Sequence, residues 1–184
     1  MGKRTKTNIT LGSGKAYIME YDSSTGMPTE TEICVAENLL GHIKNGAELT
    51  YTAEPHKESD DLGLVSKVVV NAEEAVLKLG LITWNGDTLT YLADRCKVTT
   101  TGGKRTIKIG GAGNAQGKEW VVCFFQEDKK DGNLWVLVRA TNSAGLTLTF
   151  AVDSATVLEP EFTALPQDED GTLITIIEES DATA

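Results

Sequence analysis

Hydrophobic and polar residues alternate in short runs along most of the chain, and a period of two residues is typical of β-strands. The alternation is clearest near residue 50, where Leu49 and Tyr51 form one face and Glu48, Thr50 and Thr52 form the other. This pattern predicts a strand with one face buried and one face in contact with water.

Turn-forming residues divide the remaining runs into further strands. Two glycines at 102–103 lie between alternating runs, which predicts a tight β-hairpin because such turns need positive φ angles. A second hairpin is predicted through Asp131 and Gly132. The apolar stretch 66–83 fits either a helix or a strand by its periodicity. The other expected strands, including both arms of each hairpin, lie at 14–21, 98–101, 104–109, 120–125, 134–138, 146–150, 156–165 and 172–177.

One segment has the spacing of a helix. Leu89, Leu92, Ala93 and Cys96 recur at helical intervals after Asp87, which we expect to cap the N-terminus of the helix. Many strands, one short helix and no strand–helix–strand alternation predict a mainly β fold. We expect one domain over residues 1–184, an antiparallel β-sandwich or barrel with a short flanking α-helix.

The length and charge of the chain argue against some classes of function. The chain has 184 residues, enough for a full core without a disulfide or a metal. It has 17 Lys and Arg residues and 27 Asp and Glu residues, so its net charge is −10. A negative protein is not expected to bind nucleic acid tightly, because such binding needs cations that neutralise phosphates. The basic start is not followed by an apolar run, so we expect no signal peptide, and no apolar run is long enough to predict a membrane segment.

Each candidate motif for a catalytic, metal or cofactor site lacks a residue or an element that the site requires. The glycine-rich stretch 111–117 precedes a strand rather than the helix that a dinucleotide site needs. A calcium loop aligned on Gly171 would place Pro166 and Ile177 at ligand positions. His42 and His56 have no third ligand at metal spacing. The three cysteines, at 34, 96 and 123, form no paired motif, so we expect reduced thiols. We therefore predict no enzyme activity and no cofactor.

A polar segment at 54–65 separates two strong strand patterns. It is longer than an ordinary hairpin connection, and long loops of this kind are usually functional or disordered. A solvated flexible loop and an ordered loop that contacts another subunit both remain open at this point. The charged residues that would make such contacts are Glu54, His56, Lys57, Glu58, Asp60 and Asp61.

An ordered set of segments resembles the tail tube (major tail) proteins of long-tailed bacteriophages and related prophages. The resemblance extends from about residue 8 to about residue 178, and no single motif in it is diagnostic. The segments that carry it are 11–20, 38–47, 81–86, 102–111, 127–132, 160–164 and 166–173.

The resemblance implies a structural virion protein without catalytic activity. Six subunits would form a ring whose inner sheets join into one barrel, and stacked rings would form the tube through which the genome is ejected. It also implies a single helix, an N-terminal arm (1–10), an assembly loop (54–65) that reaches a neighbouring subunit or ring, and a C-terminal tail (179–184). We then expect synthesis in the bacterial cytoplasm and a final location in the virion tail.

The implied partners are other copies of the chain, a tape measure protein in the lumen, and terminator and baseplate or distal tail proteins. DNA would pass without specific binding, and six copies would carry a charge of about −60, screened beyond about 8 Å at physiological salt. We expect Glu48, Thr50 and Thr52 to face the lumen. The alternative is that they lie on a solvated outer surface.

A different class of protein fits the same residues. An acidic β-rich chain without a chemical site also suits a β-sandwich binding module, such as a capsid decoration or adhesion domain. That class predicts a monomer or a small closed oligomer rather than open-ended tubes.

Overall fold

The computed structural model describes residues 4–5, 13–142, 145–150, 152–153 and 155–180. Most of the expected N-terminal arm (1–10) and residues 181–184 of the expected tail lie outside them. The elements in chain order are β1 (Lys15–Glu20), α1 (Glu30–Ile33), η1 (Ala36–Asn38), β2 (Leu39–Ser59), β3 (Ser66–Leu81), α2 (Gly86–Leu92), β4 (Cys96–Thr101), β5 (Lys104–Ile109), η2 (Ala112–Asn114), β6 (Trp120–Gln126), β7 (Leu134–Asn142), β8 (Glu161–Leu165) and β9 (Thr175–Glu178).

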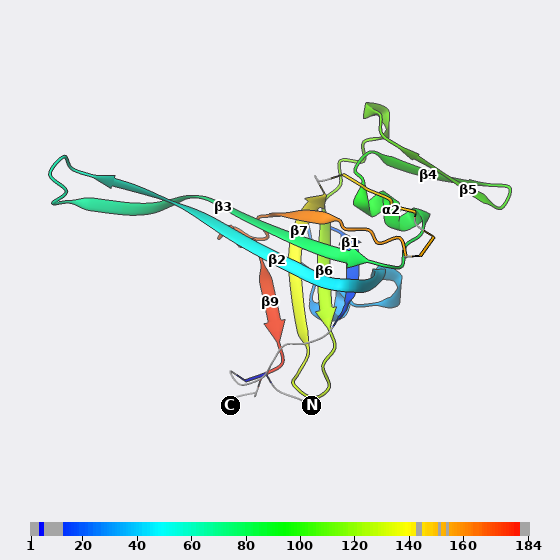
Figure 1. The fold of residues 1–184 in the computed structure, drawn as a ribbon, viewed down its shortest axis with the longest axis horizontal. Helices are drawn as coiled ribbons and strands as arrows, with labels where there is room; N and C mark the ends of the chain where they lie inside the picture. The colour runs from blue at the N-terminus through cyan, green and yellow to red at the C-terminus, as the bar shows by residue number, and fades with distance from the viewer. Residues whose placement is uncertain (1–3, 6–12, 143–144, 151, 154, 181–184) are drawn as a thin grey trace.

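Six of these strands close into a barrel within the described part of the chain (Figure 1). The order is β6-β1-β2-β3-β8-β7, and the barrel closes because β7 also pairs with β6 over the whole length of β6. All of these pairings are antiparallel. The prediction of a mainly β, antiparallel fold of the sandwich or barrel type with a short helix is confirmed.

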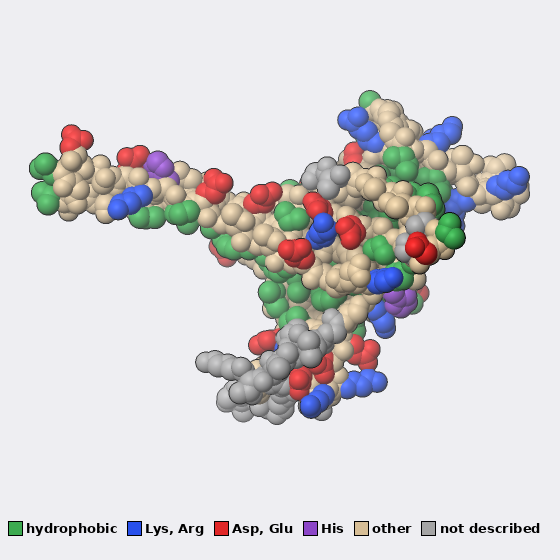
Figure 2. Space-filling view, viewed as in Figure 1, with side chains coloured by type: hydrophobic (Ala, Val, Ile, Leu, Met, Phe, Trp, Pro, Cys, Tyr) green, Lys and Arg blue, Asp and Glu red, His purple; other side chains and the backbone are tan. Residues whose placement is uncertain are grey.

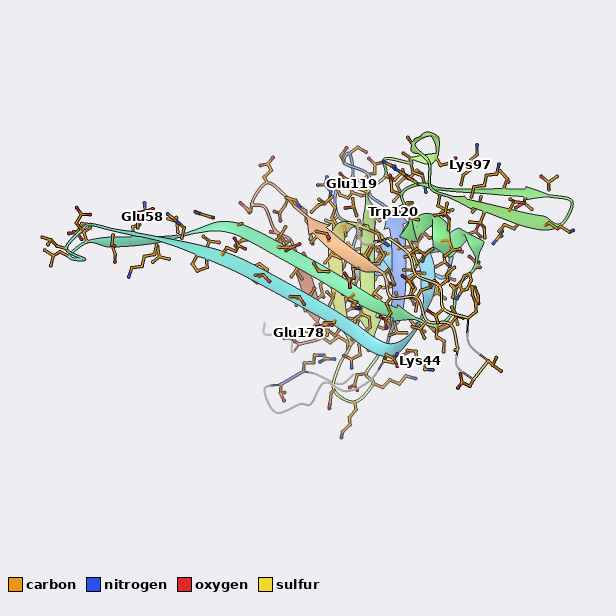
Figure 3. The ribbon with its side chains drawn as sticks, turned by 45° about the horizontal axis from the view of Figure 1, so that its top comes forward. Lys44, Glu58, Lys97, Glu119, Trp120 and Glu178 are labelled. Carbon is orange, nitrogen blue, oxygen red and sulfur yellow. The ribbon has the colours of Figure 1, made fainter. Side chains whose placement is uncertain are left out.

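The core lies inside the barrel, because alternate residues of each strand point inward. Val122 and Val138 face each other across the β6–β7 ladder, and neither is exposed. Leu77, Leu79 and Phe162 extend the same cluster from β3 and β8. Trp120 closes the cluster at the end of the barrel near α2 (Figure 3).

A second, smaller cluster covers the outer face of β1, β6 and β7. It consists of buried Tyr17, Ile33, Val121, Cys123 and Leu137. The four-residue helix α1 supplies Ile33. This helix was not predicted from the sequence. Its sequence signal is a capping box, in which the Glu32 carboxylate accepts a hydrogen bond from the Thr29 amide at 2.8 Å.

The helix α2 is shorter than predicted and has a different cap. The side-chain oxygen of Asn85 accepts hydrogen bonds from the backbone amides of Asp87 and Thr88, so Asn85 and not Asp87 is the N-cap. The helix ends at Ala93, whose φ of −138° is extended, and Cys96 already belongs to β4. The helical spacing correctly placed Leu89 and Leu92 in the core.

The hairpin β4–β5 forms a separate two-stranded sheet that packs on α2 (Figure 1). Its turn is the predicted glycine pair, with φ values of 58° and 74° at Gly102 and Gly103. A Cβ at Gly86 would lie 2.6 Å from the Arg105 side chain, so glycine is what permits this close contact. The second predicted hairpin, β6–β7, is also confirmed.

The first half of the predicted polar loop at 54–65 is instead strand, because β2 continues through residues 54–59. β2 and β3 pair in an antiparallel ladder that extends from Ile43↔Leu81 to Ser59↔Ser66. Only the turn between them, residues 60–65, is not strand. Backbone pairing needs no apolar side chains, so the polarity of 54–59 did not indicate a loop. The same ladder decides the ambiguous stretch 66–83 in favour of a strand.

Of the last three predicted strands, the structure shortens two and removes one. Residues 145–150 have no regular structure, although Leu146 and Leu148 pack against the core. The alternation at 146–150 therefore reflects core packing and not a ladder. β8 occupies the second half of the predicted strand 156–165, and β9 begins three residues later than predicted.

Candidate functional site: the arm and the open surfaces of the barrel

The outer part of the β2–β3 ribbon projects far beyond the barrel (Figure 1). All 25 residues from 50 to 74, here called the arm, are exposed. At about 3.3 Å per residue, its ten residues on β2 span roughly 33 Å. A two-stranded ribbon without a second layer is marginally stable in water. The arm therefore has the geometry of an element that is completed by a partner.

The arm has two chemically different sides. In the ladder, a residue lies on the same side as its cross-strand partner and as the residues two positions away along its own strand. Asn71 has no cross-strand partner and forms a bulge, beyond which Val70 pairs with Pro55 and Val68 pairs with Lys57. The apolar side carries Tyr51, Ala53, Pro55, Val68 and Val70, together with two charged residues, Lys57 and Glu73. The Tyr51 hydroxyl donates a hydrogen bond to the Glu73 carboxylate at 2.7 Å. The charged side carries Glu54, His56, Glu58, Lys67 and Glu74, with Val69 among them. Figure 2 shows hydrophobic side chains along one side of the arm and charged ones along the other.

The apolar side exposes large hydrophobic groups to water. Val68 is 58% exposed, Val70 is 54% exposed and Tyr51 is 53% exposed. The turn at the tip adds Leu62 and Leu64, each 79% exposed. Contiguous exposed apolar surface of this kind marks an interaction site in a folded protein. The sequence alone left these valines in an apolar stretch that fits either a helix or a strand.

The charged residues expected to make assembly contacts all lie on the arm. Glu58 lies far out along it (Figure 3), where its carboxylate is 2.6 Å from Nε2 of His56. Lys57 lies on the apolar side, where it is the cross-strand partner of Val68. Asp60 accepts a hydrogen bond from the Val65 amide at 2.7 Å, so it stabilises the turn. Asp61 is exposed in the same turn.

An apolar groove opens at the root of the arm. It has a volume of about 300 Å³ and lies between Leu49 and Leu77 on one side and Phe124, Leu134 and Val136 on the other. Leu49 and Leu77 pair across the ladder and share a side with Tyr51, so the groove and the apolar side of the arm form one continuous surface. Ile176 of β9 pairs with Val136, is 57% exposed and extends this surface further.

Two strand edges near this surface are unpaired within the described residues. β9 pairs only with β7. β2 pairs with β1 only from Leu39 to His42, and beyond them its sole neighbour is β3. Unpaired edges present rows of backbone donors and acceptors that a strand of another chain can bind.

The face of the sheet opposite the core is polar. Glu48, Thr50 and Thr52 are exposed, and the ladder places them beside Lys78, Val76 and Glu74. The Lys78 ammonium lies 3.1 Å from Glu161 and 3.9 Å from Glu159. The hydrogen bond to Glu161 is the main reason why the pKa of Lys78 is raised. The structure thus brings the three predicted residues onto one acidic, hydroxyl-bearing face.

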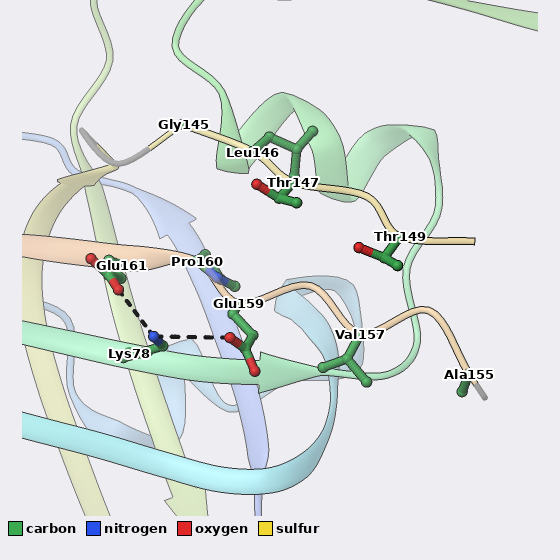
Figure 4. Close-up of a pocket in the computed structure, with 10 residues that line it drawn as sticks. All are labelled: Lys78, Gly145, Leu146, Thr147, Thr149, Ala155, Val157, Glu159, Pro160 and Glu161. Atoms are coloured by element: carbon green, nitrogen blue, oxygen red, sulfur yellow. Dashed lines mark ion pairs between the residues drawn. The ribbon is translucent and has the colours of Figure 1, made fainter. Parts of the chain in front are cut away.

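A hollow of about 590 Å³ lies beside this face (Figure 4). Lys78, Glu159 and Glu161 lie on one side of it and Thr147 and Thr149 on the other. Because the pKa of Lys78 is raised, its amine stays protonated and offers no base at neutral pH. Both glutamates are about half exposed and are held by the same ammonium group. The hollow carries a charge cluster without an activated acid, base or nucleophile.

Two of the three thiols lie close together. Sγ of Cys34 is 3.8 Å from Sγ of Cys123, and Cys123 is completely buried. The contact with Cys34, together with burial, raises the pKa of Cys123, whereas the same contact lowers that of Cys34.

The described residues contain no group of three or more His, Cys, Asp or Glu side chains that could hold a metal ion. None of the helices formed by these residues is long and apolar enough to cross a membrane. No model of a known protein family matches the sequence, and no curated protein matches it.

Proposed function

We propose that the protein is a structural subunit that assembles with copies of itself into stacked rings, which form the tail tube of a long-tailed bacteriophage or prophage. The arm is the observation that carries the proposal. Twenty-five consecutive exposed residues, with an apolar side that continues into the groove at the barrel, need a partner to be stable.

The unpaired edges support a ring as the form of assembly. β9 and the outer part of β2 lie at the two ends of the order β2-β3-β8-β7-β9. Pairing of β9 in one copy with β2 in the next joins different surfaces of the two copies. Such head-to-tail contacts generate a closed ring when the rotation per subunit closes. Six subunits per ring is the number that the sequence resemblance implies.

The polar face supports a conduit for DNA. In a ring built this way, Glu48, Thr50 and Thr52 would line the lumen together with Glu74 and Glu161. Carboxylates repel phosphate and hydroxyl groups hold water, so DNA would pass without the salt-dependent grip of a basic surface. The protein would then act without a catalytic site or a cofactor.

Electron microscopy and sedimentation of the purified protein test the proposal. We expect open-ended tubes of uniform diameter above a threshold concentration. A capsid decoration or adhesion module would remain a monomer or a small closed oligomer at every concentration, and that result would overturn the proposal.

An arm-shortened variant tests the observation that carries it. Ala53 and Glu73 are cross-strand partners, so residues 54–72 can be replaced by the two-residue turn Asn-Gly. The barrel core contains none of the deleted residues, and we expect thermal unfolding close to that of the full chain. Tube formation should be lost. A shortened variant that still forms tubes would show that the arm is not the assembly element.

A further inference from the structure

The hairpin β4–β5 is a basic element of a strongly acidic protein. Its residues 96–109 contain four cationic side chains and no carboxylate, a net charge of +4. Arg105 turns toward α2 and pairs with Asp87 at 3.0 Å. Among the described residues, Lys97, Lys104 and Lys108 form no ion pair.

The ladder places these lysines on one face. Val98 and Ile107 pair with each other and pack on the core, so residues of the other parity point outward. Lys97 and Lys108 are direct cross-strand partners on that outward face, and all three lysines are exposed. Like charges directly opposite each other destabilise a ladder. An anionic partner would reduce the repulsion between these two ammonium groups and so stabilise the hairpin.

The arm has the complementary charge. Residues 50–74 contain six carboxylates and two lysines, a net charge of −4. Glu54 and Glu58 lie on the outer part of its charged side, beyond the residues proposed to line the lumen. The arm and the hairpin project from opposite ends of the molecule, as Glu58 and Lys97 show in Figure 3. One copy therefore presents its acidic element away from its own basic element.

The root of the hairpin is held in place, so the lysines are presented at a fixed position. The Gln116 amide donates hydrogen bonds to the carbonyl oxygens of Thr90 at 3.0 Å and Cys96 at 3.1 Å. The Gly110 amide donates to the carbonyl of Arg95 at 2.7 Å. With the close contact at Gly86, these bonds fix the hairpin to α2.

We propose that the outward face of the β4–β5 hairpin, with Lys97, Lys104 and Lys108, receives the charged side of the arm of a neighbouring copy. This inference rests on the proposed self-assembly and adds the surface that the arm binds. The apolar side of the arm stays free to cover the groove or another apolar surface. Both elements are exposed, so the attraction weakens as salt shortens the screening length from about 8 Å at 0.15 M to about 3 Å at 1 M.

Charge reversal in two variants tests the pairing. K97E/K108E changes the charge of the hairpin's outward face from +3 to −1, and E54K/E58K replaces two carboxylates on the charged side of the arm by ammonium groups. Each variant alone should need at least about tenfold more protein to form tubes, because attraction is replaced by repulsion at two contacts. In an equimolar mixture each arm finds a hairpin face of opposite charge, and tubes should return near the wild-type threshold. K129E/K130E, with the same change in net charge in the β6–β7 turn, is the control.

The outcomes separate this inference from the proposed function. Variants that assemble alone like the wild type would overturn the pairing and leave self-assembly intact. Folded variants whose mixture fails to assemble would also overturn the pairing. A wild-type protein that forms no tubes at all would overturn the proposed function itself. Circular dichroism and thermal unfolding establish that each variant is folded.

Discussion

Replacing two valines on the apolar side of the arm should weaken assembly and leave the subunit folded. Val68 and Val70 are 58% and 54% exposed, so slightly more than half of each residue's surface remains to be covered by a partner. Threonine keeps the branched shape and the strand preference of valine but replaces a methyl group by a hydroxyl. The double variant V68T/V70T therefore changes the polarity of the apolar side with little change in its shape.

The expected size of the effect follows from those exposures. Burial of a whole valine side chain contributes about 1.5–3 kcal/mol, so covering the exposed half of each contributes about 1 kcal/mol. Loss at both positions amounts to about 2 kcal/mol per contact, which corresponds to about 30-fold in the concentration threshold for assembly. The subunit's own free energy of unfolding should change little, because neither side chain belongs to its core.

Val69 provides a matched control on the same strand. It is 41% exposed and lies on the charged side, paired with His56. V69T should assemble near the wild-type threshold, whereas V68T alone should raise it about fivefold, half of the double effect in free energy. Pelleting of assembled protein over a concentration series measures each threshold. An unchanged threshold for V68T/V70T, or an equal shift for V69T, would refute the assignment of the apolar side to an interface.

Three further predictions concern the subunit itself. Phe162→Ala removes a completely buried ring from the barrel core and should lower the free energy of unfolding in urea by about 3–5 kcal/mol. Asn85→Ala should cost about 1 kcal/mol in the same measurement because it removes the cap of α2; Asp87→Ala should cost less, since it removes only an exposed ion pair. Hydrogen bonds from Thr172 lower the pKa of Asp168, so the stability they add is present above the ordinary pKa of 3.8 and is lost as the pH falls through the lowered value. The melting temperature should thus fall toward about pH 2, and less steeply in Asp168→Asn.

The sequence was sufficient to predict those elements that are determined by local residues, namely tight turns and apolar strands of the core. The glycine pair at 102–103, whose φ angles are positive, made that hairpin predictable, and the apolar run at 120–125 predicted the strand β6. The cap of α2 was misplaced by two residues, because Asn85 and Asp87 are both good capping residues. The backbone hydrogen bonds to Asn85 decide between them.

The arm could not be predicted because nothing else in the described part of the chain packs on it. Polar residues at 54–59 indicated a loop and the valines at 68–70 an apolar helix or strand, yet the two segments pair with each other in one exposed ladder. Burial patterns predict which face meets a core, and this ribbon meets no core in its own chain. The basic hairpin did give a sequence signal, since residues 96–109 contain four cations and no carboxylate.

The proposed contact also limits which assemblies are possible. A contact that joins the arm of one copy to the hairpin of another joins unlike surfaces, so every added copy would present a free arm and a free hairpin for the next. A twofold dimer would have to bring both arm–hairpin contacts together in one interface, and the two elements project from opposite ends of the molecule (Figure 1). In the proposed assembly, growth would stop only when a ring closes, and the apolar surface at the root of the arm would remain to bind the next ring. Charge would then select the neighbour, and apolar burial would supply most of the stability.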